Sequence, residues 1–164
     1  MLSLFKSKSA MDEREFILRQ QKLQNYLINN GFYVFGKGSF KYKEQKKKET
    51  PSPLALGVVQ PNLIKNGKLE GILLTTENFG GLFETRKYRV YGELMPDEII
   101  LYAKEVDLSS KINSVFSGSG FYSDNLKVYR GKSTNNGIYE GFFKHFSYTL
   151  GTSKKLGDFY FETA

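Results

Sequence analysis

The spacing of apolar residues changes at residue 31. Before it, Phe16, Leu23 and Leu27 fall on one helical stripe, which is widened by Ile17, Tyr26 and Ile28. Ser9 predicts the N-cap of this helix, and Gly31 is typical of the residue that follows a helix end. The sequence therefore predicts one helix over residues 10–30 that packs on an apolar surface.

From residue 32 onward, apolar and polar residues alternate with a period of two, which is typical of strands. We expect strands at 32–43, 54–60, 68–76, 82–94, 98–106, 113–122, 126–131, 138–150 and 157–163. Turn signals separate them: Asn66-Gly67, Gly80-Gly81, Pro96-Asp97, Asp124-Asn125 and Asn136-Gly137. The chain is therefore expected to be mainly β, an antiparallel meander of about eight or nine strands after one N-terminal helix. The meander would be closed or nearly closed into a barrel, or folded as a sandwich.

One short pattern, Asn-Gly-x-x-Glu-Gly, occurs twice, at 66–71 and 136–141. Asn-Gly is a strong signal for a type I′ hairpin turn, so each copy is expected to begin a returning strand. Gly71 and Gly141 then lie inside strands, where glycine marks a bulge, a corner or a close approach of two backbones. We interpret the repeat as a feature of a strongly coiled sheet.

Two of the expected strands are apolar on both faces. The second face is represented by Ile100, Tyr102, Phe142, Phe146 and Tyr148. One helix about 10 Å wide covers roughly two strands. We therefore expect part of this face to bind a small apolar ligand, a partner protein or a second copy of the chain.

Length and composition favour a single domain over residues 1–164. Within it we expect a flexible N-terminus at 1–9, the helix, and a β domain at 32–163 with a mobile basic loop at 44–53. The absence of cysteine excludes disulfides and thiolate metal sites, and we expect no cofactor and no metal. No apolar stretch reaches the roughly 18 residues of a membrane-spanning helix. Without a signal-peptide pattern a cytoplasmic location is expected, although a processed mature chain stays open.

The net charge of +7 lies entirely in the first third of the chain. Residues 1–48 contain 11 basic and 4 acidic side chains, whereas residues 49–164 contain 13 of each. Nucleic acid or another anionic surface could bind the lysines of this region, which alternate with aromatic residues over 32–48: Lys41, Lys43, Lys46, Lys47 and Lys48. The alternative is a solvated loop, because lysine lacks the bidentate fork of arginine.

Catalytic candidates are few. His145 is the only histidine and could act as a general base with Tyr139 or Ser147 on its face of the strand. Glu70 and Glu140 could form a carboxylate pair if their strands were neighbours. The alternatives are a structural histidine and solvated glutamates, and we favour them.

The sequence therefore predicts a non-enzymatic binding domain that engages a partner protein or a small apolar ligand through an aromatic-rich β-barrel. Binding of nucleic acid or an anionic surface through residues 32–48 is the alternative. An enzyme that uses His145 ranks last.

Overall fold

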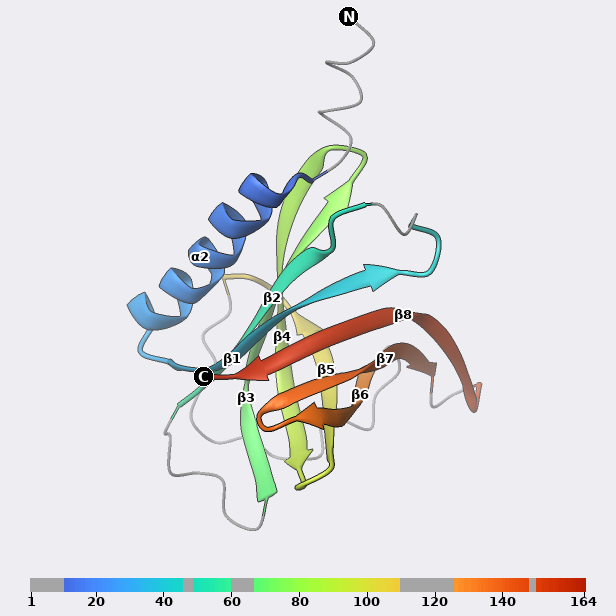
Figure 1. The fold of residues 1–164 in the computed structure, drawn as a ribbon. Coiled ribbons are helices and arrows are strands. Elements are labelled where there is room, and N and C mark those ends of the chain that lie inside the picture. Colours follow the sequence, from blue (N-terminus) through green and yellow to red (C-terminus); the bar gives the residue numbers. More distant parts are fainter. Residues whose placement is uncertain (1–10, 46–48, 60–66, 110–125, 148–149) are drawn as a thin grey trace, which may run out of the picture.

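A computed structural model describes residues 11–45, 49–59, 67–109, 126–147 and 150–164. Eight antiparallel strands form a closed barrel in which each strand pairs with its neighbours in sequence, and β8 closes the ring on β1 (Figure 1). The strands are β1 (Tyr33–Tyr42), β2 (Ser52–Val58), β3 (Lys68–Phe79), β4 (Leu82–Leu94), β5 (Glu98–Val106), β6 (Leu126–Asn135), β7 (Ile138–Ser147) and β8 (Thr152–Thr163). The prediction of a mainly β antiparallel meander with one N-terminal helix is confirmed, and the barrel is closed.

The helix α2 (Glu13–Asn29) lies outside the barrel against β1, β2 and β3. Leu23 and Leu27 are buried against the outward residues Ala55, Ile72 and Leu74, which explains why this part of the sheet is apolar on both faces. No helix in the described part of the chain is long and apolar enough to cross a membrane.

The predicted N-cap at Ser9 is wrong, because the helix begins at Glu13 with Asp12 as its N-cap. The Asp12 carboxylate accepts a hydrogen bond from the backbone N–H of Glu15 at 2.7 Å. Asp12 and Glu15 have the spacing of a capping box. Met11, which is 3% exposed, and Phe16 occupy the positions of a hydrophobic staple. These local contacts favour the start at Glu13.

The strand pattern agrees with the sequence in most places. β4 and β5 have the predicted bounds, whereas β8 begins at Thr152 instead of 157. The strand predicted at 113–122 lies outside the described residues. The described strands close the barrel without it, because β5 pairs directly with β6.

Both Asn-Gly-x-x-Glu-Gly copies place their second glycine where two backbones touch. A Cβ on Gly141 would lie 1.9 Å from the Arg130 carbonyl oxygen, and one on Gly71 would lie 2.0 Å from the Gly57 carbonyl oxygen. The turns differ. Asn136-Gly137 forms the whole link between β6 and β7, with Gly137 at φ +77°. Gly67 also has positive φ, and β3 begins directly after it at Lys68, as predicted; β2 ends at Val58, so this connection is longer than two residues.

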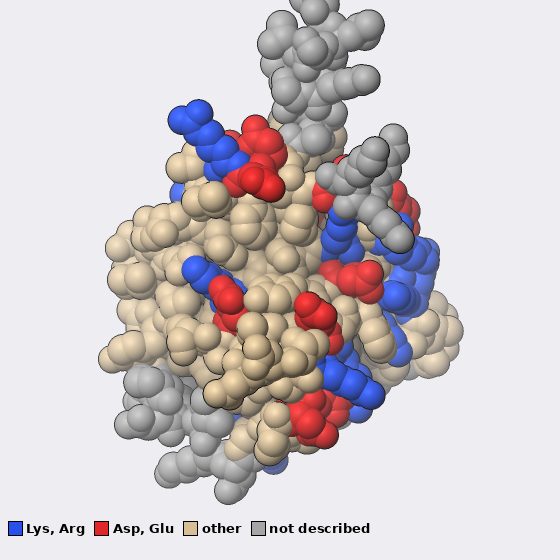
Figure 2. Space-filling view, in the orientation of Figure 1, with Lys and Arg blue, Asp and Glu red and all other residues tan. Residues whose placement is uncertain are grey.

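Charged side chains are unevenly distributed over the surface seen in Figure 2. They gather on the right of the view, away from the helix, while the area on the left is largely uncharged. Ile17, Leu18 and Ile28 are exposed apolar side chains on α2.

Candidate functional site

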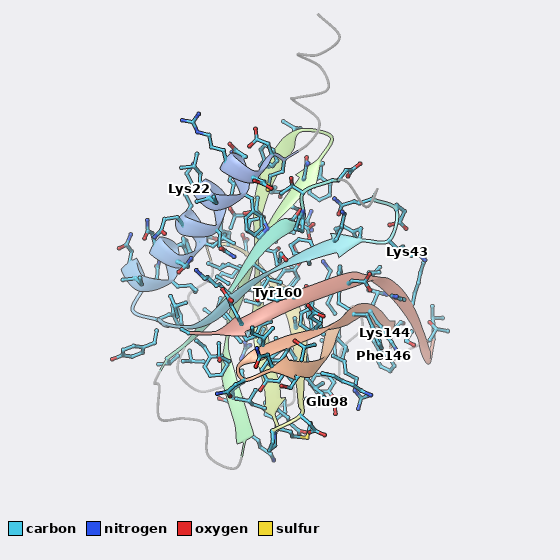
Figure 3. The ribbon with its side chains drawn as sticks, viewed as in Figure 1. Lys22, Lys43, Glu98, Lys144, Phe146 and Tyr160 are labelled. Atoms are coloured by element: carbon cyan, nitrogen blue, oxygen red, sulfur yellow. The ribbon has the colours of Figure 1, made fainter. Side chains whose placement is uncertain are left out.

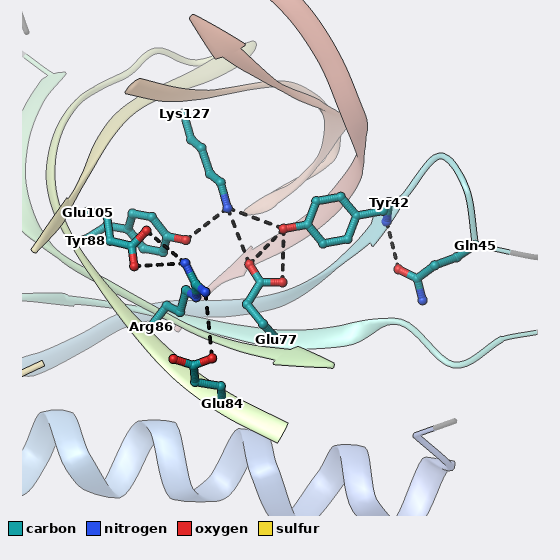
Figure 4. Close-up of polar contacts among 8 residues, drawn as sticks. All are labelled: Tyr42, Gln45, Glu77, Glu84, Arg86, Tyr88, Glu105 and Lys127. Atoms are coloured by element: carbon teal, nitrogen blue, oxygen red, sulfur yellow. Dashed lines mark hydrogen bonds and ion pairs between the residues drawn. The ribbon is translucent and has the colours of Figure 1, made fainter. Parts of the chain in front are cut away.

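Polar side chains gather inside one rim of the barrel. Tyr42 ends β1, Glu77 lies near the end of β3, and Lys127 lies near the start of β6. Tyr88 lies in the middle of β4, opposite Glu105 near the end of β5. Antiparallel neighbours bring these strand ends to the same rim. These four residues, the rim cluster, contact one another within the barrel (Figure 4).

Lys127 is the centre of the rim cluster. Its ammonium Nζ donates to the Tyr88 hydroxyl at 3.0 Å and lies 3.4 Å from both the Tyr42 hydroxyl and Glu77 Oε1. The Tyr42 hydroxyl is 2.8 and 3.0 Å from the two carboxylate oxygens of Glu77. An ammonium group has three N–H donors, so each donor of Lys127 has an acceptor within the cluster. The Lys127 and Glu77 side chains are 18% and 3% exposed, so this is a buried ion pair whose partners satisfy one another.

The protonation states of the rim cluster follow from burial and from this pair. Burial raises the pKa of Tyr42 above its ordinary value, and the Glu77 carboxylate raises it further. Burial alone would lower the pKa of Lys127, but the surrounding tyrosines and Glu77 raise it above its ordinary value. The tyrosines are neutral at neutral pH, so Glu77 supplies the negative charge that keeps Lys127 protonated. A protonated lysine has no lone pair for nucleophilic attack.

Aromatic rings fill the interior next to the rim cluster. Tyr129 stacks on Phe143 with ring centroids 5.1 Å apart, and Phe40 meets Phe143 edge to face at 5.8 Å. These three side chains are at most 2% exposed. At this level the interior is a packed core, which weakens the case for a small apolar ligand inside the barrel.

The outer face of β4–β8 carries a different arrangement. Because the strands pair in register, outward residues form rows across the sheet. One row is Arg89, Lys104, Leu126, Phe146 and Ser153, and the next is Tyr91, Tyr102, Val128, Lys144 and Lys155. Four of these ten described residues are basic and none is acidic. We call these two rows the basic rows.

A hollow of about 270 Å³ lies within the basic rows. Leu126 is 1% exposed there and packs with Tyr91, Tyr102 and Phe146. Figure 3 shows Lys144 and Phe146 near each other on β7, on the opposite side of the view from the helix. We call this the Tyr102–Phe146 hollow, and its lining residues are Tyr102, Leu126, Val128, Lys144, Phe146 and Ser153.

The next two rows along the strands are mixed in charge. They are Glu93, Ile100, Arg130, Phe142 and Asp158, followed by Glu98, Lys132, Glu140 and Tyr160. A wider hollow of about 600 Å³ lies over them, lined by residues that include Glu98, Arg130 and Phe142. In these mixed rows four acidic residues accompany two basic ones, so the charge of the outer face is segregated along the strands.

The structure places four of the five predicted ligand or partner-binding residues on this outer face. Tyr102 and Phe146 line the hollow, whereas Ile100 and Phe142 belong to the mixed rows. Their strands, β5 and β7, are separated by β6, and the helix lies over β1–β3 instead. Tyr148 lies outside the described residues.

The four catalytic candidates are not brought together. His145 and Tyr139 are six residues apart along β7, which is about 20 Å in a strand. Glu70 lies on β3 and Glu140 on β7, strands that are not neighbours, so the glutamates do not form the carboxylate pair. Among the described residues, no group of three or more side chains could hold a metal ion.

The predicted anion-binding lysines are only partly described. Lys41 donates to the Glu49 carbonyl oxygen at 2.5 Å, and Lys43 is exposed just after β1. Lys46, Lys47 and Lys48 lie outside the described residues. The aromatic residues expected to stack with bases mostly pack inward: Phe40 lies in the barrel core, Phe35 stacks on Phe161, and Phe32 packs beneath the helix.

Sequence reasoning missed the rim cluster and the basic rows. Glu77 and Lys127 are 50 residues apart, and only closure of the barrel joins them. The sequence did contain one indication that Lys127 is unusual. This lysine stands between the apolar residues Leu126 and Val128 at the start of a predicted strand.

Comparison with known proteins adds no functional information. No family model matches the chain, and no curated protein or solved structure matches it significantly.

Proposed function

We propose that this protein is a non-enzymatic binding domain that engages a protein partner through the Tyr102–Phe146 hollow. The observation that carries the proposal is an aromatic hollow, surrounded by basic residues, on a barrel face that the helix leaves uncovered. Aromatic and aliphatic side chains at the centre of a patch with charged residues around them are typical of protein interfaces.

Two features make the outer face a better site than the interior. The ring contacts around Phe143 fill the barrel next to the rim cluster. The buried ion pair of Lys127 with Glu77 is satisfied by the neighbouring tyrosines. A ligand entering at this rim would have to displace these contacts.

The alternative functions have less support. Stacking of nucleic acid bases requires exposed rings, whereas Phe40 is buried in the barrel core. An enzyme that uses His145 would need catalytic partners. Tyr139 lies about 20 Å away along β7 and Glu140 lies on the opposite face of the sheet, so Ser147 is the one candidate partner near His145 on its face. We therefore favour a protein-binding role.

Partner capture from extracts of the source cells tests the proposal. Phe146→Ala removes a ring from the hollow, and Phe79→Ala is the matched control, because Phe79 is 50% exposed at the end of β3. We expect the captured protein to fall at least tenfold for Phe146→Ala and to stay unchanged for Phe79→Ala, with both variants folded by circular dichroism. Equal capture by both variants would show that the hollow is not the binding site.

A further inference from the structure

We infer that the occupant of the Tyr102–Phe146 hollow is an acidic protein segment that inserts an apolar side chain between Tyr102 and Phe146. The inference rests on the proposed function and specifies the chemistry of the partner. Three observations carry it: the size of the hollow, the cations around it, and the acids that limit the basic rows on one side.

The size of the hollow fits a side chain. Its volume of about 270 Å³ falls below the range of roughly 300–1,000 Å³ that is usual for small-molecule pockets. Its walls are the Tyr102 and Phe146 rings, with Leu126 and Val128 between them. An aliphatic or aromatic anchor from a longer chain would bury its surface there, while the rest of that chain lies over the sheet.

The charges around the hollow favour a negative partner. Lys144 lines the hollow itself, and Lys104 pairs in register with Leu126. Arg89 lies directly opposite Lys104, and Lys155 lies directly opposite Lys144. Like charges directly opposite each other destabilise a sheet, so carboxylates arriving beside Lys104 and Lys144 would offset part of the positive charge of this face.

Part of this repulsion is already offset in the free protein. Lys144 and Lys155 lie 5.1 and 5.7 Å from the centroid of the Phe142 ring, and Lys155 is 3.3 Å from Asp158. Asp158 belongs to the mixed rows, so the Lys155–Asp158 pair marks one limit of the basic rows. The positive charge of Lys104, which pairs in register with Leu126 at the hollow, is left for the partner.

The mixed rows argue against a long polyanion. Glu93, Asp158 and Glu140 lie there on the same outer face, and they would repel phosphates that extend beyond the basic rows. The basic rows cross five strands at about 4.8 Å spacing, which gives a strip roughly 20 Å long. An extended peptide of about six residues spans that length, so a short acidic segment fits the strip better than nucleic acid does.

Selection from a phage-displayed library of random peptides tests the inference. The full chain is the target, and Lys104→Glu combined with Lys144→Glu is the reversed variant. Lys22→Glu combined with Lys68→Glu is the control, because it changes the net charge equally at two exposed lysines away from the hollow. We expect enriched peptides that combine acidic residues with an aromatic or aliphatic anchor.

The selected peptides should bind the reversed variant at least tenfold more weakly, bind the control as they bind the natural chain, and dissociate as salt is raised. Thermal melting checks the fold, and the reversed variant should melt no lower than the natural chain, because each new glutamate faces a cation.

Neutral or basic peptides that need Phe146 for binding would contradict the acidic partner and leave the proposed function standing. If no selected peptide depends on Phe146, both fail. If only anionic vesicles or single-stranded DNA bind, and the reversed variant loses that binding, the protein partner is replaced by a polyanion.

Discussion

Gly141 shows how one residue encodes the curvature of the barrel. A side chain at this position would meet the Arg130 carbonyl oxygen of the neighbouring strand first, and a backbone atom cannot rotate away as a side chain could. The sequence predicted a special backbone position from the repeated Asn-Gly-x-x-Glu-Gly pattern. It could not distinguish a bulge from a close approach, because that depends on which strand lies alongside.

Gly141→Ala should lower the free energy of unfolding by about 3 kcal/mol, since overpacking against a rigid backbone is costly. Gly80→Ala is the control. Gly80 has φ +62° and open space around it, so alanine there meets only the left-handed backbone cost of about 1 kcal/mol. Urea unfolding measures both variants, and a loss for Gly141→Ala no larger than that for Gly80→Ala would contradict the clash.

The rim cluster predicts a specific response to alkali. Burial raises the pKa of Tyr42 and of Tyr88 above the ordinary value of 10.0, and the pKa of Lys127 is also raised, from 10.5. At high pH the folded state therefore holds more protons than the unfolded state, so the free energy of unfolding falls as pH rises above about 10. Below that pH this contribution is fully present.

Tyr42→Phe tests this explanation. It removes a hydroxyl bonded to a buried carboxylate, so it should lower stability at neutral pH by about 2 kcal/mol. It should also make the alkaline fall shallower, since one of the groups with a raised pKa is gone. Tyr33→Phe, at an exposed position outside the cluster, should change neither quantity. The cluster would not be the cause if Tyr42→Phe left the slope above pH 10 unchanged in urea titrations.

At the scale of elements, the sequence predicted what local pattern controls. The alternation of β4 and β5 indicated their bounds, because turn residues flank both strands. The helix start was missed by a few residues, since Ser9 and Asp12 are both good caps and the choice depends on the burial of Met11. The strand was predicted to end at residue 76, whereas β3 continues to Phe79. A charged residue such as Glu77 indicates the end of a strand, and its contacts with Lys127 and Tyr42 inside the barrel are not visible in the sequence.

The packing of α2 on the barrel predicts that alanine substitutions on its two sides change the free energy of unfolding by different amounts. Leu27 is fully buried against β2 and β3, so Leu27→Ala should cost about 2–5 kcal/mol. Leu18 is 53% exposed on the same helix, and Leu18→Ala should cost less than about 0.5 kcal/mol. Thermal or urea unfolding compares them. Similar losses would mean that the helix does not pack through Leu27.

At the scale of the whole molecule, folding redistributes the charge that the sequence shows. The excess of lysine lies in residues 1–48, yet the basic rows come from the rest of the chain, residues 49–164, which contains 13 basic and 13 acidic residues. Register places four basic residues in two rows that contain no acid, and four outward acids in the next two rows beside Arg130 and Lys132. This segregation could not be predicted without knowing which strands pair and in which register.

The basic rows also predict the solution state. A two-fold contact between two copies through this face would bring the basic rows of one copy against those of the other, and like-charge contact opposes association. The protein should therefore remain a monomer of 18.8 kDa in light scattering across a dilution series, including at low salt where repulsion is strongest. A dimer that Phe146→Glu abolishes would contradict this, because the hollow would then bind a second copy. A dimer that survives Phe146→Glu but is lost in Ile17→Glu would place the contact on the exposed side of α2. The Tyr102–Phe146 hollow would then still face solvent in that dimer, accessible to an acidic partner.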